Sequence, residues 1–334
     1  MKKTVAIVLN WNNAEDTILC LSSLLNLKKN GKQIEIVIVD NCSDDDSRDQ
    51  IIKNILSLNY VSGESKVNKN QIDNIEELLF FSTDIQDLPN IYFAKSISNL
   101  GYSGGNNNGI RLGQILEADY FWILNNDVVV DKEAFLFLAQ RMEIDRKIGI
   151  CGAHIMMFNE KEITQCLGGS YFTSFSGKGF PILEDHFDKT PTNRMVESKI
   201  SYISGASMFI RKDFISRVGL LDERFFLFCE EIDWAIRSNE IFNLGVELKS
   251  IIYHKEGATI GTGSASNSKG GSKKSEFYLA RSKLILTWKH RKHFFISVFI
   301  FQIIRALRLG FLGRYDLCIS ILKACSPFHG KFYE

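Results

Sequence analysis

The sequence lacks a strong excess of charge of either sign. Its 334 residues include 40 Lys and Arg against 39 Asp and Glu, a formal net charge of +1. Nucleic-acid-binding proteins carry a clearly basic surface, so this balance argues against nucleic acid as a partner. The average hides a difference along the chain. Residues 281 to 334 contain ten Lys and Arg but two acids, a net charge of +8 that leaves −7 for residues 1 to 280.

The sequence also lacks a long apolar run, a leader-like cleavage site and paired cysteines. The longest charge-free apolar stretch, residues 294 to 304, has eleven residues where a spanning helix needs about 20, so no spanning helix is expected. The first apolar run is short and leads into Asn10, which favours a strand over a signal peptide. The seven cysteines form no C-x-x-C pair, as expected for reduced core thiols in a cytoplasmic protein.

What the sequence does contain is an alternation of strand-like and helix-like segments. Hydrophobic residues make up 45% of the chain, enough for a sizeable core. Val- and Ile-rich runs predict strands, and apolar residues at helical spacing predict helices between them. In chain order the strands are expected at 4–10, 34–40, 91–96 and 120–124, and the helices at 14–27, 107–116 and 132–142. This order predicts an α/β fold with a mostly parallel sheet covered by helices on both faces.

The alternation weakens in four other parts of the chain. Residues 62–89 are polar and are expected to leave the sheet and return. After residue 148 the strand-like pieces 150–158, 202–210 and 246–253 predict a mixed arrangement. Residues 261–274 are rich in Gly, Ser and Lys and predict a mobile loop, and helical sequence follows it to about residue 325.

Polar residues follow several of the predicted strands, where α/β proteins bind their ligands. Asn10 and the pair Asp40-Asn41 suit a nucleobase or ribose. Residues 99–109, which begin with Asn99 and Gly101 and continue through Gly105 and Asn106, form a Gly- and Asn-rich segment before a helix, a place that favours phosphate. An ordinary turn with an Asn cap is the alternative for each of them.

Two further groups carry ionisable side chains. Asn125-Asn126-Asp127 ends an apolar strand and suits Mg²⁺ or Mn²⁺, with His254 as a second ligand; a helix-dipole partner and a structural histidine are the alternatives. Glu230, Glu231 and Asp233 follow an aromatic run that favours a raised pKa and hence a general base, or simply complement a helix dipole. Helical spacing places Glu230 and Asp233 on one face and Glu231 on another.

Taken in order, these motifs resemble the family 2 glycosyltransferases of the rhamnosyltransferase-like branch over roughly residues 4 to 290. The resemblance rests on VAIVLNWN, IVIVDNCSDD, NLGYSGGNNNGI, ILNNDVVV, the run ISGASMFIRKDFISRVGLLDERFFLFCEEIDWAIR, and HKEGATIG. It implies a GT-A fold, with a Rossmann-like, mostly parallel central sheet flanked by helices, in a catalytic domain of residues 1–280. A basic, amphipathic helical extension occupies residues 281–334.

The resemblance also implies a role for each site residue. Asp127 and His254 hold a divalent metal, Mg²⁺ or Mn²⁺, and Glu231 is the general base, in a position where the family has Asp, with Glu230 as the other candidate. The Gly residues and lysines of the loop before residue 281 (Lys269, Lys273 and Lys274) favour by themselves a lid that closes over the donor, and a solvated linker is the alternative. The nucleotide-sugar would be bound by Asn10, Asp40, Asn41, Asn99, Gly101, Gly105, Asn106 and Asn125.

The implied reaction is an inverting hexosyl transfer from a nucleotide-sugar donor. The donor is a UDP- or dTDP-sugar, with dTDP-rhamnose as one candidate. The acceptor is a hydroxyl of a glycan or a lipid-linked oligosaccharide in surface polysaccharide biosynthesis. A sugar nucleotidyltransferase and a non-catalytic nucleotide-sugar-binding protein are the alternatives.

The basic extension has two interpretations. Clusters such as Lys289 to His293, Arg305 and Arg308 flank an aliphatic and aromatic helix, which suits an anionic membrane surface at the inner face of the plasma membrane. The alternative is a helix pair that packs on the catalytic domain or builds a homodimer with a solvated basic rim.

Overall fold

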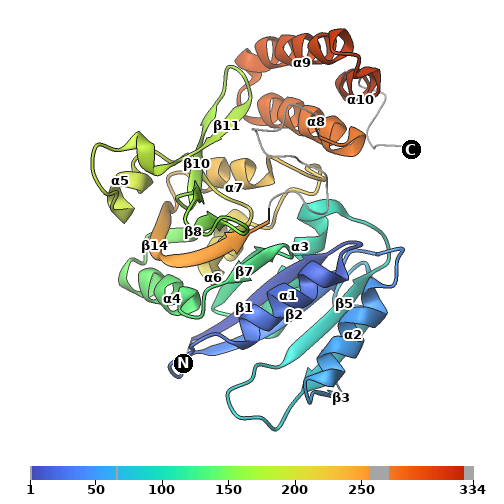
Figure 1. Ribbon diagram of the computed structural model, residues 1–334, viewed down its shortest axis with the longest axis vertical. Helices are drawn as coiled ribbons and strands as arrows, with labels where there is room; N and C mark the ends of the chain where they lie inside the picture. Colours follow the sequence, from blue (N-terminus) through green and yellow to red (C-terminus); the bar gives the residue numbers. More distant parts are fainter. Residues whose placement is uncertain (1, 65–66, 256–270, 327–334) are drawn as a thin grey trace.

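The computed structural model describes residues 2–64, 67–255 and 271–326 and has a mixed α/β fold (Figure 1). The strands of its large sheet are β1 (Lys3–Asn10), β2 (Gln33–Asp40), β3 (Val61–Gly63), β4 (Ile75–Ser82), β5 (Ile91–Ser96), β6 (Tyr120–Asn125), β7 (Val128–Val130), β8 (Ile148–Met157), β9 (Thr164–Cys166), β13 (Ser207–Arg211) and β14 (Asn243–His254). A small sheet contains β10 (Gly169–Thr173), β11 (Lys178–Pro181) and β12 (Tyr202–Ile203). The helices are α1 (Ala14–Leu25), α2 (Ser47–Ser57), α3 (Gly101–Ile115), α4 (Ala134–Ile144), α5 (Asn193–Glu197), α6 (Lys212–Val218), α7 (Glu230–Ser238), α8 (Lys273–His290), α9 (Phe295–Phe311) and α10 (Tyr315–Cys325).

The centre of the large sheet is parallel, which confirms the predicted fold class. Its strand order is β3-β4-β5-β2-β1-β6-β13-β8-β14-β7, with β9 beside β8. Strands β5, β2, β1 and β6 pair in parallel, while β13 runs antiparallel between β6 and β8. The register places Asn10 opposite Asp40 and Leu9 opposite Asn125, so the carboxyl ends of three strands meet at one edge.

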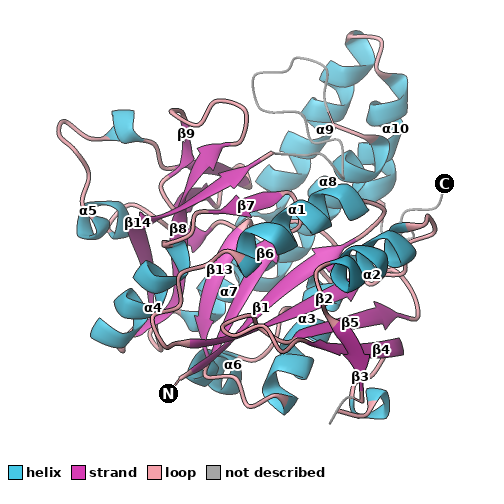
Figure 2. Ribbon diagram, turned by 60° about the horizontal axis from the view of Figure 1, so that its bottom comes forward, coloured by secondary structure: helices cyan, strands magenta, loops and turns pink. Residues whose placement is uncertain are grey.

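Helices cover both faces of this sheet and create two apolar layers (Figure 2). Helices α1, α2 and α4 bury residues such as Leu21 and Phe135 on one face. On the other face, α3, α6 and α7 bury residues such as Ile110 and Trp234. With both faces covered, the sheet is a rigid base for its carboxyl-terminal loops.

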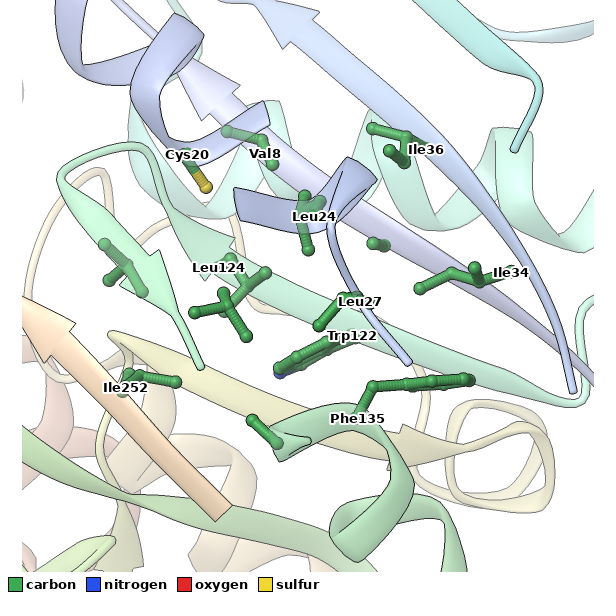
Figure 3. Packing of buried hydrophobic residues seen from close by; sticks show 14 of the residues in the cluster. Val8, Cys20, Leu24, Leu27, Ile34, Ile36, Trp122, Leu124, Phe135 and Ile252 are labelled. Carbon is green, nitrogen blue, oxygen red and sulfur yellow. The ribbon is translucent and has the colours of Figure 1, made fainter. Parts of the chain in front are cut away.

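The first apolar layer surrounds Trp122 of β6 (Figure 3). The rings of Trp122 and Phe135 have centroids 6.2 Å apart, and the indole Nε1 donates to Ser207 Oγ at 2.9 Å.

Cys20 of α1 lies in the same layer, where burial raises the pKa of its thiol. All seven cysteines are free, four buried and three half-buried, in keeping with the expected unpaired thiols.

The polar segment 62–89 belongs to the sheet, so the prediction that it leaves the sheet is wrong. Strand β4 pairs antiparallel with β5, and β3 pairs with β4. The apolar residues at the centre of β4 include Phe81, which is 1% exposed. Arg48 of α2 pairs with Glu77 of β4 and ties this edge to the layer of helices. The polar residues that flank β4 obscured a strand that lies between β3 and β5.

The Gly-rich segment after β5 is helical from Gly101 onward, although a loop was predicted up to about residue 107. Glycines every fourth residue face the sheet. A Cβ on Gly105 would lie 2.4 Å from Leu9 Cδ1, and one on Gly109 would lie 2.4 Å from Ile7 Cγ2. These glycines therefore allow α3 to approach β1 closely, and only the start of the segment belongs to a ligand-binding turn.

The C-terminal helices α8, α9 and α10 form a layered unit above the sheet, with α9 farther from the sheet than α8 (Figure 1). The expected domain boundary at residue 280 falls inside α8, so the helical region begins earlier, at Lys273.

Within the described residues, the segment Lys292–Phe311 is long and apolar enough to cross a membrane by length and composition, with a mean hydropathy of 1.8. Counting only charge-free residues was therefore too restrictive, because a 20-residue segment tolerates the two arginines.

Candidate active site

A pocket of about 300 Å³ lies at the carboxyl ends of β1, β2 and β6, beneath α3, α7 and α8. Eight of the predicted site residues line it, and they come from five separate parts of the chain. These residues are Asn41, Asn99, Gly101, Asn125, Asp127, Glu230, Glu231 and His254. The pocket is therefore the place where the sequence motifs converge.

A carboxylate and an imidazole face each other in this pocket. Asp127 follows β6, and His254 ends β14 opposite Val128. Asp127 Oδ1 and His254 Nε2 are 3.1 Å apart; Asp127 is buried, and the His254 side chain is 11% exposed. Neither atom has a hydrogen-bond partner of good geometry among the described residues.

A hydrogen bond to the other ring nitrogen orients the imidazole. His254 Nδ1 lies 3.0 Å from Gln165 Oε1 of β9. Because this amide oxygen only accepts, Nδ1 carries a proton and Nε2 points toward the carboxylate. In the neutral ring, two electron-rich atoms then face each other, an arrangement that fits a divalent cation bound between them.

The donor set fits a metal that takes its other ligands from outside the protein. Within the ranges that the structure covers, no group of three or more His, Cys, Asp and Glu side chains gathers at one point. Mg²⁺ and similar hard cations keep several waters and bind through one or two carboxylates together with substrate phosphates. Asp127 and His254 suit that kind of site.

Two adjacent acids enter the pocket from the first turn of α7. The two residues before the helix, Phe228 and Cys229, have φ values of +69° and +68°, a left-handed conformation that strains non-glycine residues. This sharp turn directs both Glu230 and Glu231 into the pocket. Helical spacing predicts that Glu231 points away from Glu230. This prediction is wrong, because both side chains line the same pocket.

Burial and mutual interaction set the protonation of this pair. Burial raises the pKa of Glu230 well above its usual value, and the charge of Glu231 raises it further. Burial also raises the pKa of Glu231, but hydrogen bonds from the backbone and from Glu230 lower it in part. As the pH rises, Glu231 therefore loses its proton first, and Glu230 keeps its proton to a higher pH.

Asp233 lies outside the pocket, one turn further along α7. Its side chain is fully buried and accepts from Arg237, Lys289 and His290 at 2.6 to 2.7 Å. Burial alone would raise the pKa of Asp233, but the hydrogen bonds from His290 and Lys289 and the charge of Arg237 bring it below its usual value. This acid joins α7 to α8 and has a structural role.

Asn41 holds the turn that leads into α3. Its amide nitrogen donates to Asn99 Oδ1 at 3.1 Å and to the Gly101 carbonyl at 2.9 Å, and its oxygen accepts from the backbone of Leu100 at 3.0 Å. Gly101 has a φ of +68°, and a Cβ there would lie 2.2 Å from the Phe226 carbonyl oxygen. The turn therefore needs both the amide and the glycine.

Four predicted ligand-binding residues do not line the pocket. Asn10 and Asp40 are fully buried and bonded to each other at 2.8 Å, and Thr17 and Ser43 complete their hydrogen bonds. The other two are Gly105, which packs on β1, and Asn106, which donates to the Tyr102 carbonyl. The structure places all four as supports behind the pocket wall, because their polar groups and close contacts are directed into the protein.

Aromatic residues that the sequence motifs did not single out form much of the remaining wall. Trp11 follows β1, and Lys274 of α8 lies over its ring at 4.5 Å. Tyr102 donates to the Gly205 carbonyl at 2.7 Å. Phe226 stacks on Tyr278 with centroids 4.3 Å apart. An aromatic residue directly after a strand was a signal for Trp11, whereas nothing local marks Tyr278.

Another unpredicted part of the wall is the turn between β12 and β13. A single strand was expected over 202–210, but Ser204 to Ala206 break it and line the pocket. Of the lysines expected in a closing loop, Lys273 and Lys274 begin α8, and Lys269 lies outside the described residues with most of the predicted loop 261–274.

Comparisons with known proteins identify the fold. No protein-family model matches the sequence, and no curated protein matches it either. Among solved structures, the mannosyltransferase PcManGT from Pyrobaculum calidifontis, in complex with GDP-Man and Mn²⁺, is similar with a TM-score of 0.53 and 10% identity over 96% of this chain and 73% of that chain. TarS from S. aureus is similar with a TM-score of 0.50 and 14% identity over 97% and 80% of the two chains.

A third similar structure is GalNAc-T7 with UDP, GalNAc and Mn²⁺. Its TM-score is 0.59 and its identity 15%, and the match covers 88% of this chain and 50% of that one. At these identities the likeness concerns the fold alone. The chain therefore has a GT-A-like fold, and C-terminal helices are present.

Proposed function

We propose that the protein is a metal-dependent glycosyltransferase that transfers a sugar from a nucleotide-sugar to a hydroxyl group with inversion. The observation that carries this proposal is the convergence, in one pocket of a GT-A-like fold, of a carboxylate-histidine pair and a pair of buried acids. The first pair suits the diphosphate of a donor, and the second suits the hydroxyl of an acceptor.

On this proposal, Asp127 and His254 hold Mg²⁺ or Mn²⁺. When bound, such a cation supplies positive charge that stabilises the leaving diphosphate. Two of the structural neighbours, PcManGT and GalNAc-T7, were solved with Mn²⁺, which supports this assignment. Asn41 and Asn99 hold the turn beside Trp11, where a planar base can stack.

Glu231 is the group that takes the proton from the acceptor hydroxyl. It ionises before Glu230, and a hydrogen bond from Glu230 orients it. A base with a raised pKa has more affinity for the proton that it must remove, which favours proton transfer near neutral pH. Direct attack by the activated hydroxyl on the anomeric carbon inverts its configuration.

The proposal also names the chemical class of the donor and that of the acceptor. We propose a UDP- or dTDP-sugar as donor, with dTDP-rhamnose as one candidate hexose donor. The acceptor is a glycan or lipid-linked oligosaccharide of surface polysaccharide biosynthesis, made on the cytoplasmic side. A thermal-shift series with UDP-, dTDP- and GDP-sugars, each with Mn²⁺ and with a chelator, identifies the donor by the largest metal-dependent stabilisation.

The proposal is tested with Glu231→Gln, Asp127→Ala and the control Glu15→Gln, which changes an exposed acid of α1. We expect the first variant to lose transfer by about 10² to 10⁴-fold while it keeps donor binding, because only the base is removed. The second is expected to lose metal-dependent donor binding. Full transfer activity in Glu231→Gln would contradict the assigned base, and donor binding without any transfer in the unchanged protein would favour a binding protein.

A further inference from the structure

The outward face of α9 is apolar, the reverse of an ordinary surface helix. Ile296, Ile300, Ile304, Leu307 and Phe311 recur every three or four residues and therefore share one face. Each is at least half exposed, and Phe311 is 91% exposed. The opposite, buried face of the helix contains Val298, Gln302 and Ala306.

The apolar surface continues past the end of α9. Leu312 lies in the connecting turn, and Tyr315, Ile319 and Leu322 lie on the exposed face of α10. Together with the five exposed residues of α9, these four residues are here called the α9–α10 face. Apolar patches of this extent are rare on monomeric soluble proteins unless a partner covers them.

Cationic side chains border the α9–α10 face. Arg291, Lys292 and His293 are exposed just before α9, and Arg308 and Lys323 are exposed beside the patch. Lys292 also lies 5.5 Å over the ring of Trp288, which is 59% exposed. The single acid between residues 281 and 326 is Asp316, which lies 3.7 Å from Arg314. An apolar centre with a basic border and an exposed tryptophan matches the surface of an anionic lipid layer.

We propose that the α9–α10 face docks on an anionic membrane surface, with its apolar side chains among the acyl chains and its basic border at the headgroups. A second copy of the chain is a poorer occupant, because pairing this face with itself would bring together two copies of its basic border, which contains the exposed Arg291, Lys292, Arg308 and Lys323. The membrane neutralises that charge instead.

The structure favours docking over spanning. The inner face of α9 packs on α8, where Arg305 pairs with the buried Glu276 at 2.8 Å, and α10 packs on both helices. Crossing the bilayer would separate this ion pair and expose its charges to lipid. The outer face of α9 is available without unfolding the unit.

The position of α8 relates this surface to the pocket. Tyr278 and Lys274 of α8 line the pocket, and α9 packs on the same helix. If the proposed transferase function holds, a lipid-linked acceptor would reach the pocket from the membrane to which the enzyme is bound. Docking itself does not depend on that function, and it is measured without any transfer assay.

The test is co-sedimentation with vesicles of phosphatidylcholine alone and of phosphatidylcholine with phosphatidylglycerol. We expect the unchanged protein to bind the anionic vesicles only, more weakly at high salt. The double variant Ile304→Glu/Phe311→Glu should bind roughly tenfold or more weakly. Ile144→Glu, which places the same charge at an 82% exposed isoleucine of α4, should bind like the unchanged protein.

Other results would overturn the proposal. Equal vesicle binding by the double variant and the unchanged protein would show that the α9–α10 face does not dock on the membrane. A concentration-dependent dimer that the double variant loses, with no vesicle binding, would assign the face to a second copy. Protein that stays with the vesicles after alkaline extraction would indicate a spanning helix. Since the changed residues are exposed, thermal unfolding of the variants should match the unchanged protein and confirm folding.

Discussion

Glu230 shows how burial changes the protonation of a carboxyl group next to Glu231, the proposed base. It is 5% exposed, and burial and the neighbouring Glu231 raise its pKa. A neutral, protonated Glu230 donates a hydrogen bond to Glu231 and so favours the ionised form of its neighbour. The two adjacent acids can therefore have different protonation states and different roles.

The raised pKa of Glu230 predicts how stability changes with pH. A carboxyl group with a raised folded-state pKa stabilises the protein fully below its unfolded pKa, near 4.5, and that contribution is lost as pH rises. We expect Glu230→Gln, which removes this titration, to unfold a few degrees higher than the unchanged protein at pH 7.5 and to match it near pH 4. Thermal unfolding across this range checks the difference, and parallel curves for the two proteins would show that Glu230 does not titrate in this way.

In the proposed metal site, Gln165 is a positioning residue that acts through His254. Its oxygen lies 3.0 Å from His254 Nδ1 and fixes which ring nitrogen faces Asp127. We expect Gln165→Leu to weaken Mn²⁺ binding about 10 to 100-fold, measured by metal titration of the purified protein without substrate. Gln165→Glu keeps an acceptor oxygen at that place and should restore most of the affinity. Equal Mn²⁺ affinity in all three proteins would contradict the assignment.

At the scale of single elements, α3 shows that glycine has two separate uses in one segment. Gly101 permits the left-handed turn at the pocket, whereas the glycines further along let the helix approach β1. Local sequence did not separate these uses, because a Gly-rich stretch after a strand is equally typical of a phosphate-binding loop.

This distinction predicts opposite results for two glycine substitutions in helices. Gly109→Ala places a Cβ 2.4 Å from Ile7 Cγ2, and we expect a loss of about 1 to 3 kcal/mol of unfolding free energy. Gly310→Ala in α9 meets nothing closer than Cys318 Sγ at 3.6 Å, so the helix propensity of alanine should keep or raise stability by up to about 1 kcal/mol. Denaturant unfolding measures the unfolding free energy of both variants. Equal changes in the two variants would contradict the conclusion that Gly109 is needed for close packing on β1.

At the scale of the whole molecule, Asp233 connects the acids of the pocket to the C-terminal helices. Its carboxylate binds Arg237 of its own helix and Lys289 and His290 of α8, and Lys289 also pairs with Asp222 at 2.7 Å. The helix that presents Glu230 and Glu231 is thus held by the unit that carries the α9–α10 face.

We expect Asp233→Asn to destabilise the protein by about 3 to 5 kcal/mol, because Arg237, Lys289 and His290 lose a buried carboxylate partner. Since the pKa of Asp233 is below its usual value, its contribution is present above the unfolded pKa and is lost as pH falls through the folded value. The difference in unfolding free energy between Asp233→Asn and the unchanged protein should therefore become smaller as the pH is lowered. Asp316→Asn, which changes an exposed acid beside Arg314, should alter stability by less than about 0.5 kcal/mol in the same thermal unfolding series.

Strand periodicity and the placement of polar residues after strands were enough to predict the parallel centre of the sheet. The same reasoning brought Asn41, Asn125 and Asp127 to one edge, because carboxyl ends of parallel strands meet there. It did not separate them from Asn10 and Asp40, which follow the same strands but point into the protein. Which side of a strand end a polar residue takes depends on packing by distant elements.

The sequence by itself determined the alternation of strands and helices, the chemistry of the acids and histidine, and the split in charge along the chain, because these depend on local residue type and order. Only the tertiary structure decided which residues meet. Gln165 lies 89 positions before His254, and Tyr278 closes a pocket that begins at Leu9. It also decided that the apolar face of α9 points outward, because periodicity defines a stripe on a helix, while the packing of α8 and α10 decides which stripe remains uncovered.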